Sequence, residues 1–368
     1  MCSISRADQS YRTRGTPLSV GRTVSMPDRS YSAAKRFQTG IVVDAHAHPP
    51  DYLPKFASTT LRWLNRDTMP PEFSFGQLPS AGVDVIVANA VGDWTVTAWW
   101  GRPAWQAIEK QLTRIRAQAK QAHATIATSA RHVLQEFESH RTAIVLGLEG
   151  GDGIGTSLSR VDELYELGVR LLAPVHLTNN QIGTACLPWQ YYTGGLLAPR
   201  RRERGLTAFG RDLVMRMNSL GMIIDVSHLD SATLRDVTEL TRQPIIASHS
   251  GARKIQQFER FLEDDDILGI AATGGLVGLW PYLYRGHGIA DMGDLMNHAR
   301  HIGELVGAAH LCLGTDLNGV PGMMASYRGE QDVGVVAENL SSAGFDESEV
   351  QGIMGGNFMR VFGQVQPG

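Results

Sequence analysis

Short apolar runs alternate with longer amphipathic segments along most of the chain, and this alternation predicts the fold. The runs are too brief for helices and continuous enough to be strands that are buried on both faces of a parallel sheet. Helical patterns lie between them. We therefore expect an α/β fold of the (β/α)8 TIM-type barrel class. The eight predicted strands cover residues 41–43, 83–90, 143–148, 169–175, 222–226, 245–247, 275–279 and 311–314.

Two consecutive βα units in the middle of the chain show the repeating pattern most clearly. Thr207 can cap a helix that ends at Gly221, and the apolar run that follows closes in His228. Ser231 can cap a second helix, and the next apolar run closes in His249. Because parallel strands end at one edge of a sheet, the two imidazoles should leave the same edge, where barrels of this class build their active sites.

Residues 93–140 are the main excursion from this pattern, and we expect them to be mostly helical. The four tryptophans between positions 94 and 105 fit helix packing better than a substrate pocket. Three histidines in the excursion have no motif around them and are expected to face solvent. They are His123, His132 and His140.

Polar side chains stand at the predicted carboxyl end of several strands. Two histidines spaced i, i+2 point to one side of a strand, so both rings can reach one metal ion. Taken singly, each residue has an ordinary structural explanation, but packing does not explain why all of them converge on one edge. The set is His46, His48, Glu149, His176, His228, His249 and Asp316.

Neutral imidazoles with a bridging carboxylate are a ligand set typical of zinc, and a two-metal site activates water while it polarises an electrophile. Glu149 is the candidate bridge. Asp316 is the candidate general acid and base, because a carboxylate near the nucleophile can take its proton and pass it to a leaving amine. Arg253, which follows His249 closely, has a planar fork suited to a substrate carboxylate, although a surface ion pair would explain it too.

The length and the charge of the chain limit the domain organisation and the kinds of partner that it can have. The chain has 368 residues, which is enough for one barrel as a single domain over residues 39–368. Its net charge is −3. Residues 1–38 carry seven basic and two acidic residues, a charge of +5, which leaves −8 on the rest. We expect residues 1–38 to be a disordered basic leader and the body not to bind nucleic acid. No apolar run is long enough for a membrane span.

Three cysteines, an odd number, suit neither a disulfide framework nor a zinc knuckle. We therefore expect a reducing compartment and a cytoplasmic protein.

At the residues named above the chain resembles the membrane (renal) dipeptidase family of zinc peptidases, which adopt a metal-dependent β/α barrel. The resemblance covers about residues 44–362 and is most specific in the central block from Gly205 to Arg253. It rests on the stretches DAHAHPP, GLEGGDGIG, LYELGVRLLAPVHLTNN, GLTAFGRDLVMRMNSLGMIIDVSHLDSAT with PIIASHSGAR, LGTDLNGV and GIMGGNFMRVF.

The resemblance implies two divalent metal ions, most often Zn2+, with Glu149 as the bridge between them. It implies that His46 and His48 complete one zinc site and that His228 and His249 complete the other. It also implies that His176 contacts the scissile carbonyl, that Arg253 contacts the terminal carboxylate, and that Asp316 handles the proton.

This chain departs from the family pattern at the first strand, where the family has H-x-D and the chain has His46-Ala47-His48. A neutral ligand there replaces an anionic one, which bears on metal preference and substrate range. The broader amidohydrolases use H-x-H, often with a carbamylated lysine at the fourth strand, but that strand here leads to His176.

Three functions remain open on the sequence. The leading hypothesis is a dinuclear zinc dipeptidase that hydrolyses dipeptides with a free carboxylate through a metal-bridging hydroxide. The second is another amide, lactam or ester hydrolase on the same scaffold. The third is a metal-binding barrel without turnover. We expect a small peptide as the substrate and a homodimer as the assembly.

Overall fold

The computed structural model describes residues 40–50, 52–190 and 205–366. The chain divides into two units, Met1–Lys35 and Arg36–Gly368, and the described residues all belong to the second. The predicted basic leader, residues 1–38, lies outside the described residues and stays a prediction. None of the helices within the described ranges is long and apolar enough to cross a bilayer.

All eight predicted strands occur within the described residues, which also contain three short strands that were not predicted. Most differ from their predicted bounds by one to three residues, since strand ends are decided by pairing and not by composition. The strands are β1 (Val43–Ala47), β2 (Val85–Val91), β3 (Thr125–Ile126), β4 (Ala143–Glu149), β5 (Val169–Ala173), β6 (Ile223–Ile224), β7 (Ile246–Ser250), β8 (Leu276–Leu279), β9 (Leu283–Tyr284), β10 (His287–Gly288) and β11 (Leu311–Leu313).

The parallel strands form two sheets and not one continuous ladder. One sheet has the order β1-β2-β4-β5-β6, with β3 paired to β4, and the other has the order β11-β8-β7. Isolated parallel bridges join the two sheets, Asp225 to Ile246 on one side and Ala47 to Leu317 on the other. The prediction of a closed (β/α)8 barrel is therefore met only in part. The gap at β6 has a local cause: only Ile223 and Ile224 pair with β5 before the chain turns toward His228.

The strands nevertheless enclose a common apolar core. One cluster of buried side chains takes at least one residue from every predicted strand, for example Val43, Val85, Leu171 and Ile246. Phe358 and Phe362 of the last helix belong to the same cluster, so this helix packs against the interior that the strands share. The barrel-like arrangement thus rests on apolar packing even where the ladder is interrupted.

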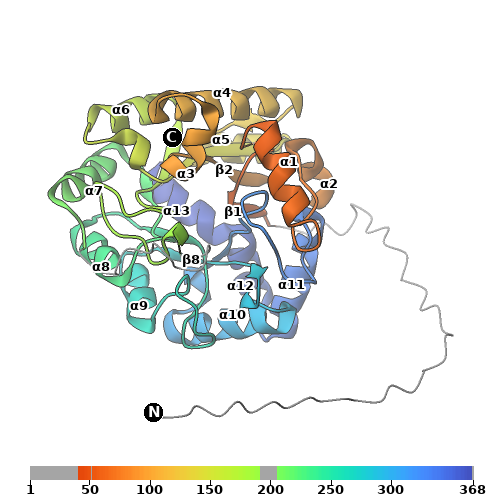
Figure 1. The fold of residues 1–368 in the computed structure, drawn as a ribbon. Coiled ribbons are helices and arrows are strands. Elements are labelled where there is room, and N and C mark those ends of the chain that lie inside the picture. The colour runs from red at the N-terminus through yellow and green to blue at the C-terminus, as the bar shows by residue number, and fades with distance from the viewer. Residues whose placement is uncertain (1–39, 51, 191–204, 367–368) are drawn as a thin grey trace, which may run out of the picture. The chain divides into compact units, whose positions relative to one another are not determined.

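Helices surround the strands and cover their outer faces (Figure 1). The excursion after β2 is mostly helical as expected, although it also contains the unpredicted β3. The helices are α1 (Lys55–Leu64), α2 (Leu78–Ala81), α3 (Trp94–Thr97), α4 (Ala104–Gln121), α5 (Ala130–Glu138), α6 (Ser159–Glu166), α7 (Ala208–Leu220), α8 (Ser231–Leu240), α9 (Asp264–Ala272), α10 (Met292–Val306), α11 (Val333–Ser342), α12 (Glu347–Gln351) and α13 (Asn357–Val365).

The central helices begin and end largely where the sequence places them. The Thr207 hydroxyl caps α7 by accepting the Gly210 N–H, and Gly221 ends α7 with a φ of 73° that favours glycine. The cap of α8 differs from expectation. Asp230 accepts the N–H of Thr233 there, while the predicted cap, Ser231, donates its hydroxyl to a neighbouring helix. Asp and Ser are both good caps, so their order along the chain did not distinguish them.

Two strands carry one extra residue at the point where they bear a histidine. The register of β1 against β2 shifts between Asp44 and Ala47, around His46, and that of β7 against β8 shifts between Ala247 and Ser250, around His249. An extra residue of this kind bends a strand and re-aims its side chains, and such irregularities concentrate beside active sites. The extra residues therefore change the direction in which the His46 and His249 side chains point at the ends of their strands.

The shift in β7 requires a glycine on its neighbour. A Cβ atom on Gly278 of β8 would overlap the Ser248 carbonyl oxygen. We predict that Gly278→Ala lowers the free energy of unfolding by about 1–3 kcal/mol or more, the usual cost of overpacking. The control is Gly334→Ala in α11, where a Cβ meets nothing within 4 Å, and which should be neutral or stabilising by up to about 1 kcal/mol. Thermal or urea unfolding measures both, and equal stability of the two variants would contradict the packing argument.

Candidate metal centre

The residues singled out at the strand ends come together in space. His46 and His249 lie within β1 and β7, Glu149 ends β4, and the others follow their strands closely. All are buried except His176, whose side chain is 13% exposed. The predicted convergence at one edge is therefore present in the structure.

Glu149 is the centre of the cluster, with five imidazoles around its carboxylate. Each ring directs its Nε2 atom toward one of the two carboxylate oxygens. The Nε2–O distances are 3.4 Å for His46, 3.1 Å for His48, 3.4 Å for His176, 3.0 Å for His228 and 3.7 Å for His249.

The outward nitrogens of three of these rings have partners that orient them. His48 Nδ1 lies 3.2 Å from the Asn89 carbonyl oxygen. The Nδ1 atoms of His46 and His249 lie 3.1 Å and 2.9 Å from the Ser248 hydroxyl, which donates to Asp225. Such outer contacts select the tautomer that presents Nε2 inward and are typical of histidines that bind metals.

Asp225 was not anticipated from the sequence, although it anchors this outer layer. It is 3% exposed and also accepts the hydroxyl and N–H of Ser227 and the N–H of Ser248. Burial alone would raise its pKa, but the contact with His46 and the two serine hydroxyls lower it, so the carboxylate stays charged. A single Asp inside an apolar run was the available signal.

Asp316 occupies a strained turn beside His48. Its φ is +57°, in the left-handed region that non-glycine residues seldom adopt, and its N–H donates to the His46 carbonyl oxygen. Its Oδ1 lies 3.3 Å from His48 Nε2. Asn318, at φ +64°, braces the turn by donating to the His48 carbonyl oxygen. Strain of this kind persists where the surroundings over-determine a functional geometry.

The electrostatics of the cluster divide it into two halves. Burial disfavours a charged His48, but hydrogen bonds to Asp316 and Glu149 raise its pKa to about 9. For His228 and His249, burial lowers the pKa well below the usual value, and the nearby Arg260 lowers it further. Burial would raise the pKa of Glu149, but the surrounding histidines hold it well below its usual value. A cation binds neutral imidazoles, so metal binding at His48 would release its proton.

The donor set fits divalent metal ions. His46 Nε2 and Glu149 Oε1 are buried and make no hydrogen bond within the described residues, which is costly unless a cation contacts them. Three overlapping groups could each hold an ion, and in each the ligand atoms lie within 4.8 Å of one another. The groups are His46, Glu149 and His249; His46, His48 and Asp316; and Glu149, His176 and His228.

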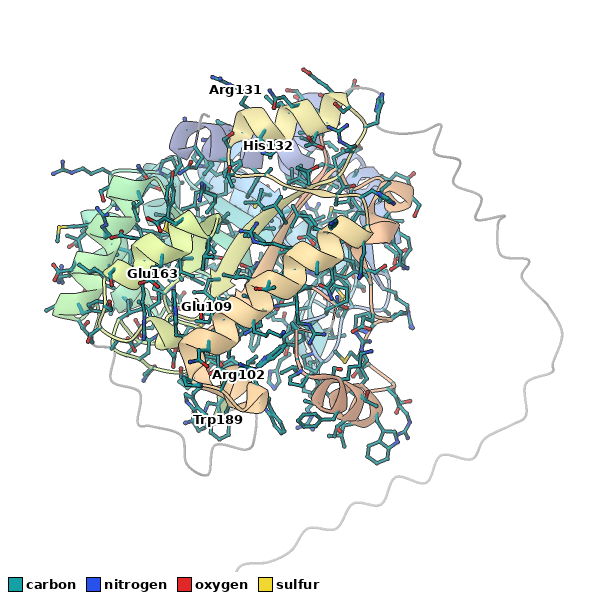
Figure 2. The ribbon with its side chains drawn as sticks, turned by 90° about the horizontal axis from the view of Figure 1, so that it is seen from above. Arg102, Glu109, Arg131, His132, Glu163 and Trp189 are labelled. Atoms are coloured by element: carbon teal, nitrogen blue, oxygen red, sulfur yellow. The ribbon has the colours of Figure 1, made fainter. Side chains whose placement is uncertain are left out.

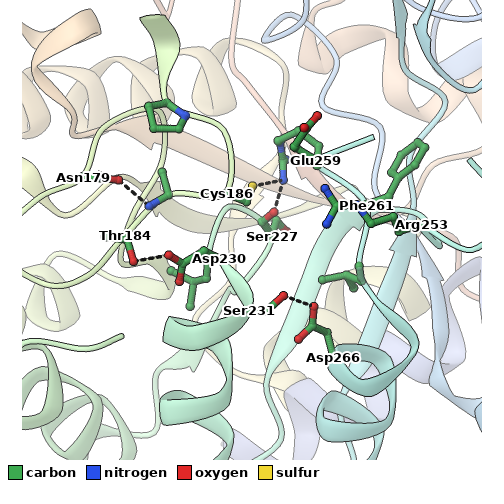
Figure 3. A pocket seen from close by; sticks show the side chains of 15 residues that line it. Asn179, Thr184, Cys186, Ser227, Asp230, Ser231, Arg253, Glu259, Phe261 and Asp266 are labelled. Carbon is green, nitrogen blue, oxygen red and sulfur yellow. Dashed lines mark hydrogen bonds between the residues drawn. The ribbon is translucent and has the colours of Figure 1, made fainter. Parts of the chain in front are cut away.

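A polar pocket adjoins the metal centre, and two arginines line it (Figure 3). Arg253, the predicted carboxylate ligand, places its Nη1 2.9 Å from Glu263 Oε1. Arg260 also lines the pocket. It is 1% exposed, its Nη2 lies 3.1 Å from His228 Nε2, and its guanidinium stacks over Trp280 at 4.9 Å. Arg260 therefore reaches the metal centre more directly than Arg253.

Sequence reasoning missed Arg260 because it lies in an irregular segment after β7 and not at a strand end. It also missed Asp93, a fully buried carboxylate that contacts His176. Asp93 is the first residue of the predicted excursion and caps α3, and this position was the signal that could have found it.

The histidines of the excursion lie outside the cluster. His132 sits beside Arg131 on α5, at the outer surface (Figure 2). His123 and His140 are exposed, so solvation is confirmed for these two, while His132 is half-buried and lies 3.9 Å from Glu136. Of the tryptophans, Trp94 and Trp99 are 51% and 53% exposed, and Trp94 packs on Trp189 at 5.7 Å.

Comparison with known proteins places the chain in a family. A profile described as membrane dipeptidase (peptidase family M19) matches residues 33–367. The chain belongs to this family. The resemblance noted from its motifs is thereby confirmed.

Over the segments that align, curated relatives are about 30% identical to this family member. "Uncharacterized dipeptidase C965.12" of Schizosaccharomyces pombe is 32% identical over 230 residues, which are 60% of this chain and 53% of that protein. Dipeptidase 3 of Mus musculus is 30% identical over 239 residues, 62% of this chain and 45% of that protein. The chain thus spans about half the length of the curated relatives it matches.

Solved structures share the fold. The probable dipeptidase PvdM from Pseudomonas aeruginosa has a TM-score of 0.76 at 19% identity and covers 91% of this chain and 97% of its own. A metallo peptidase from Rhodobacter sphaeroides, solved with a phosphinate mimic of the dipeptide L-Ala-D-Ala, has a TM-score of 0.74 at 19% identity and covers 89% of this chain and 100% of its own. The TIM-barrel-like α/β architecture is therefore common to these proteins.

Because the candidate metal centre is built from buried residues, we predict that the thermal stability of the protein depends on bound metal. Zn2+ added to chelator-treated protein should raise Tm, because an ion that binds only the folded state stabilises it, by about 2.7 kcal/mol at a free concentration 100 times Kd. His48→Ala should reduce this rise. The control is His310→Ala, which removes a ring bonded to the Gly275 carbonyl oxygen outside the cluster and should leave the rise unchanged. Equal rises in both variants, measured by calorimetry, would exclude His48 as a ligand.

Proposed function

We propose that the protein is a metallo-dipeptidase that uses two divalent cations, most simply Zn2+, to hydrolyse the amide bond of dipeptides with a free C-terminal carboxylate. The observation that carries the proposal is Glu149 encircled by five Nε2 atoms at 3.0–3.7 Å, with Asp316 and Arg260 beside them. Such a set provides ligands, a proton carrier and an anion-binding group within one site.

The family and its members support the choice of dipeptides. The relatives from fission yeast and mouse are named dipeptidases, and the Rhodobacter enzyme was solved with a dipeptide mimic. A substrate of this size also suits a buried site beside a small polar pocket, because its free carboxylate lies close to the scissile bond.

The residues divide the work as follows. His46, His48, Glu149, His228 and His249 would hold the ions. Bound here, divalent ions would polarise the scissile carbonyl and make water a better nucleophile at neutral pH. Asp316 accepts a proton at Oδ1 or Oδ2 from the attacking water and delivers it to the leaving amine, so that the carboxylate is regenerated.

Arg260 is proposed to bind the substrate carboxylate. Its planar fork suits bidentate binding, and stacking on Trp280 restrains its plane. Arg253, the candidate from the sequence, lines the same pocket and is the second candidate for this role, although it contacts Glu263.

His48 is where the chain departs from the family pattern, and this departure bears on metal preference and substrate range. A neutral imidazole in place of the family's carboxylate leaves the centre about one charge more positive when loaded. This keeps a second function open, hydrolysis of another amide, a lactam or an ester on the same scaffold. Assembly as a homodimer and a cytoplasmic location stay predictions.

Hydrolysis assays test the proposal directly. Chelator-treated protein, reloaded with Zn2+, Mn2+ or Co2+, is assayed against a dipeptide library that includes D-residues at the C-terminal position, and against lactam and ester substrates. We expect metal-dependent cleavage of dipeptides. Metal binding without cleavage of any substrate would leave the metal-binding barrel without turnover, and cleavage of lactams or esters alone would select the second function.

Asp316→Asn should keep both metals and lower kcat by roughly 100-fold or more, the usual scale for loss of a general acid or base. The amide is nearly isosteric, so the turn should persist. Metal content measured on the same samples distinguishes the two roles: a parallel loss of metal would make Asp316 a ligand instead of a proton carrier.

Arg260→Ala should reduce kcat/KM for free dipeptides by about 2–5 kcal/mol, as for truncation of one side of a desolvated charge pair. C-terminally amidated dipeptides should be poor substrates of the native enzyme and lose much less. Arg253→Ala serves as the matched variant, with a smaller expected loss. If Arg253→Ala showed the larger, carboxylate-dependent loss, the role would pass to Arg253, and equal losses on acid and amide would remove it from both.

A further inference from the structure

The two arginines that line the pocket belong to one loop, residues 251–262, which follows β7. Arg253 stands near its start and Arg260 near its end, and the loop contributes part of the pocket lining (Figure 3). Main-chain hydrogen bonds close the base of the loop. Leu262 N–H donates to the Gly251 carbonyl oxygen at 2.9 Å, and Arg253 N–H donates to the Leu262 carbonyl oxygen at 2.8 Å. The contacts that fix this base therefore place both guanidinium groups.

His298 of α10 packs against the base of the loop. It is 1% exposed, and its Nδ1 atom accepts the N–H of Ala252 at 2.9 Å. Its ring also packs against the ring of Phe261, with 4.8 Å between the centroids. A Cβ atom on Gly251 would lie 2.8 Å from His298 Nδ1 and 2.9 Å from the Phe261 ring, so this close approach requires glycine. His298 thus contacts both ends of the loop, and each contact is made with the neighbour of one arginine.

The main-chain donor determines the role of the imidazole. A backbone N–H only donates, so His298 Nδ1 presents a lone pair to Ala252. Burial, with the nearby His301 as a smaller cause, lowers the pKa of His298 to about 4, and the ring is therefore neutral at neutral pH. Ala252 is completely buried. Without this acceptor its N–H would be left buried and unsatisfied, which is unfavourable enough to displace the loop.

We infer that His298 is a positioning residue for substrate recognition: by holding the base of the 251–262 loop, it sets where Arg253 and Arg260 present their guanidinium groups to the substrate carboxylate. The inference rests on the proposed dipeptidase function and adds to it a residue that acts through others. It applies whichever of the two arginines binds the carboxylate, because both belong to the same loop.

Two substitutions separate the hydrogen bond from the bulk of the ring. His298→Leu removes the acceptor and keeps an apolar side chain, whereas His298→Asn places an amide oxygen near the position of Nδ1 and keeps the acceptor. The control is Ile302→Ala, which truncates a buried side chain one turn further along α10. This control destabilises the fold without removing an acceptor from the loop.

Kinetics of the zinc-loaded protein are the first measurement. His298→Leu should lower kcat/KM for free dipeptides by about 10–100-fold, mostly through KM, because displaced arginines bind the carboxylate less well. C-terminally amidated dipeptides should lose much less, and His298→Asn should recover most of the native value. Ile302→Ala should keep the native preference for acid over amide. Equal losses of His298→Leu on acid and amide, or no recovery in His298→Asn, would overturn the inference.

Amide hydrogen exchange, followed by mass spectrometry, reports on the loop without turnover. Peptides spanning residues 250–262 should exchange faster in His298→Leu than in the native chain, His298→Asn or Ile302→Ala. Zn2+ affinity should be the same in all four proteins. Unchanged exchange in His298→Leu would overturn the inference, and so would a loss of Zn2+ affinity confined to His298→Leu, because the substitution would then act through His249, which precedes the loop.

Phe261→Leu keeps the inference testable even if His298→Leu does not fold. It removes the other contact of the imidazole and keeps an apolar side chain, so it should show the same selective loss on free dipeptides to a smaller extent. Native kinetics on both substrates would contradict the role of His298.

The proposed function fails separately. A native protein that binds dipeptides in calorimetry without cleaving them would refute the dipeptidase. The dissociation constants of free and amidated dipeptides, compared across the same variants, would then still decide the role of His298. Dipeptide hydrolysis that is indifferent to His298→Leu would do the reverse, and a native protein that binds no dipeptide would overturn both.

Discussion

A buried carboxylate surrounded by imidazoles is the interaction on which this structure depends. Glu149 is 1% exposed and ends the central strand β4, where a charge without partners would be strongly destabilising. Five histidines from four other strand ends compensate it. The carboxyl edge of the sheet is therefore polar and lies above an apolar interior. Cations would bind there, because the edge offers imidazole and carboxylate ligands.

An outer layer converts this cluster into a defined geometry. Asp225 and Ser248 orient His46 and His249, Asn89 orients His48, and Asp93 orients His176. The backbone takes part as well, because β1 and β7 each carry an extra residue where they bear a histidine. Positioning by packing and hydrogen bonds is what a metal site needs, since small displacements of ligands reduce affinity and rate alike.

The interruption of the sheet between β6 and β7 is related to the placement of the site residues. Paired β6 is only two residues long, and the chain leaves it to place Ser227 and His228 beside β7 and Arg260. Apolar packing replaces the missing ladder: residues of all the predicted strands share one core with α13. Placing the site residues at the strand ends thus interrupts the hydrogen-bonded sheet, and apolar packing in the core compensates for the lost strand pairing.

The sequence by itself determined the eight main strands, the α/β class and most residues of the candidate site. This was predictable because apolar runs and caps are local signals, and because parallel strands must end at a common edge. Asp44 shows the limit of the local signal: predicted just beyond the first strand, it lies within β1 and accepts hydrogen bonds from Thr315, far away in the sequence.

Only the tertiary structure decided how these residues share their work. It placed Arg260 at the metal centre and paired Arg253 with Glu263, although both arginines follow the same strand. It brought Asp93 to His176 across 83 positions of sequence. It also broke the predicted barrel into two sheets. Each of these outcomes depends on contacts between segments that are distant in the chain, and the energy of such contacts is set by packing, which a pattern along one segment does not contain.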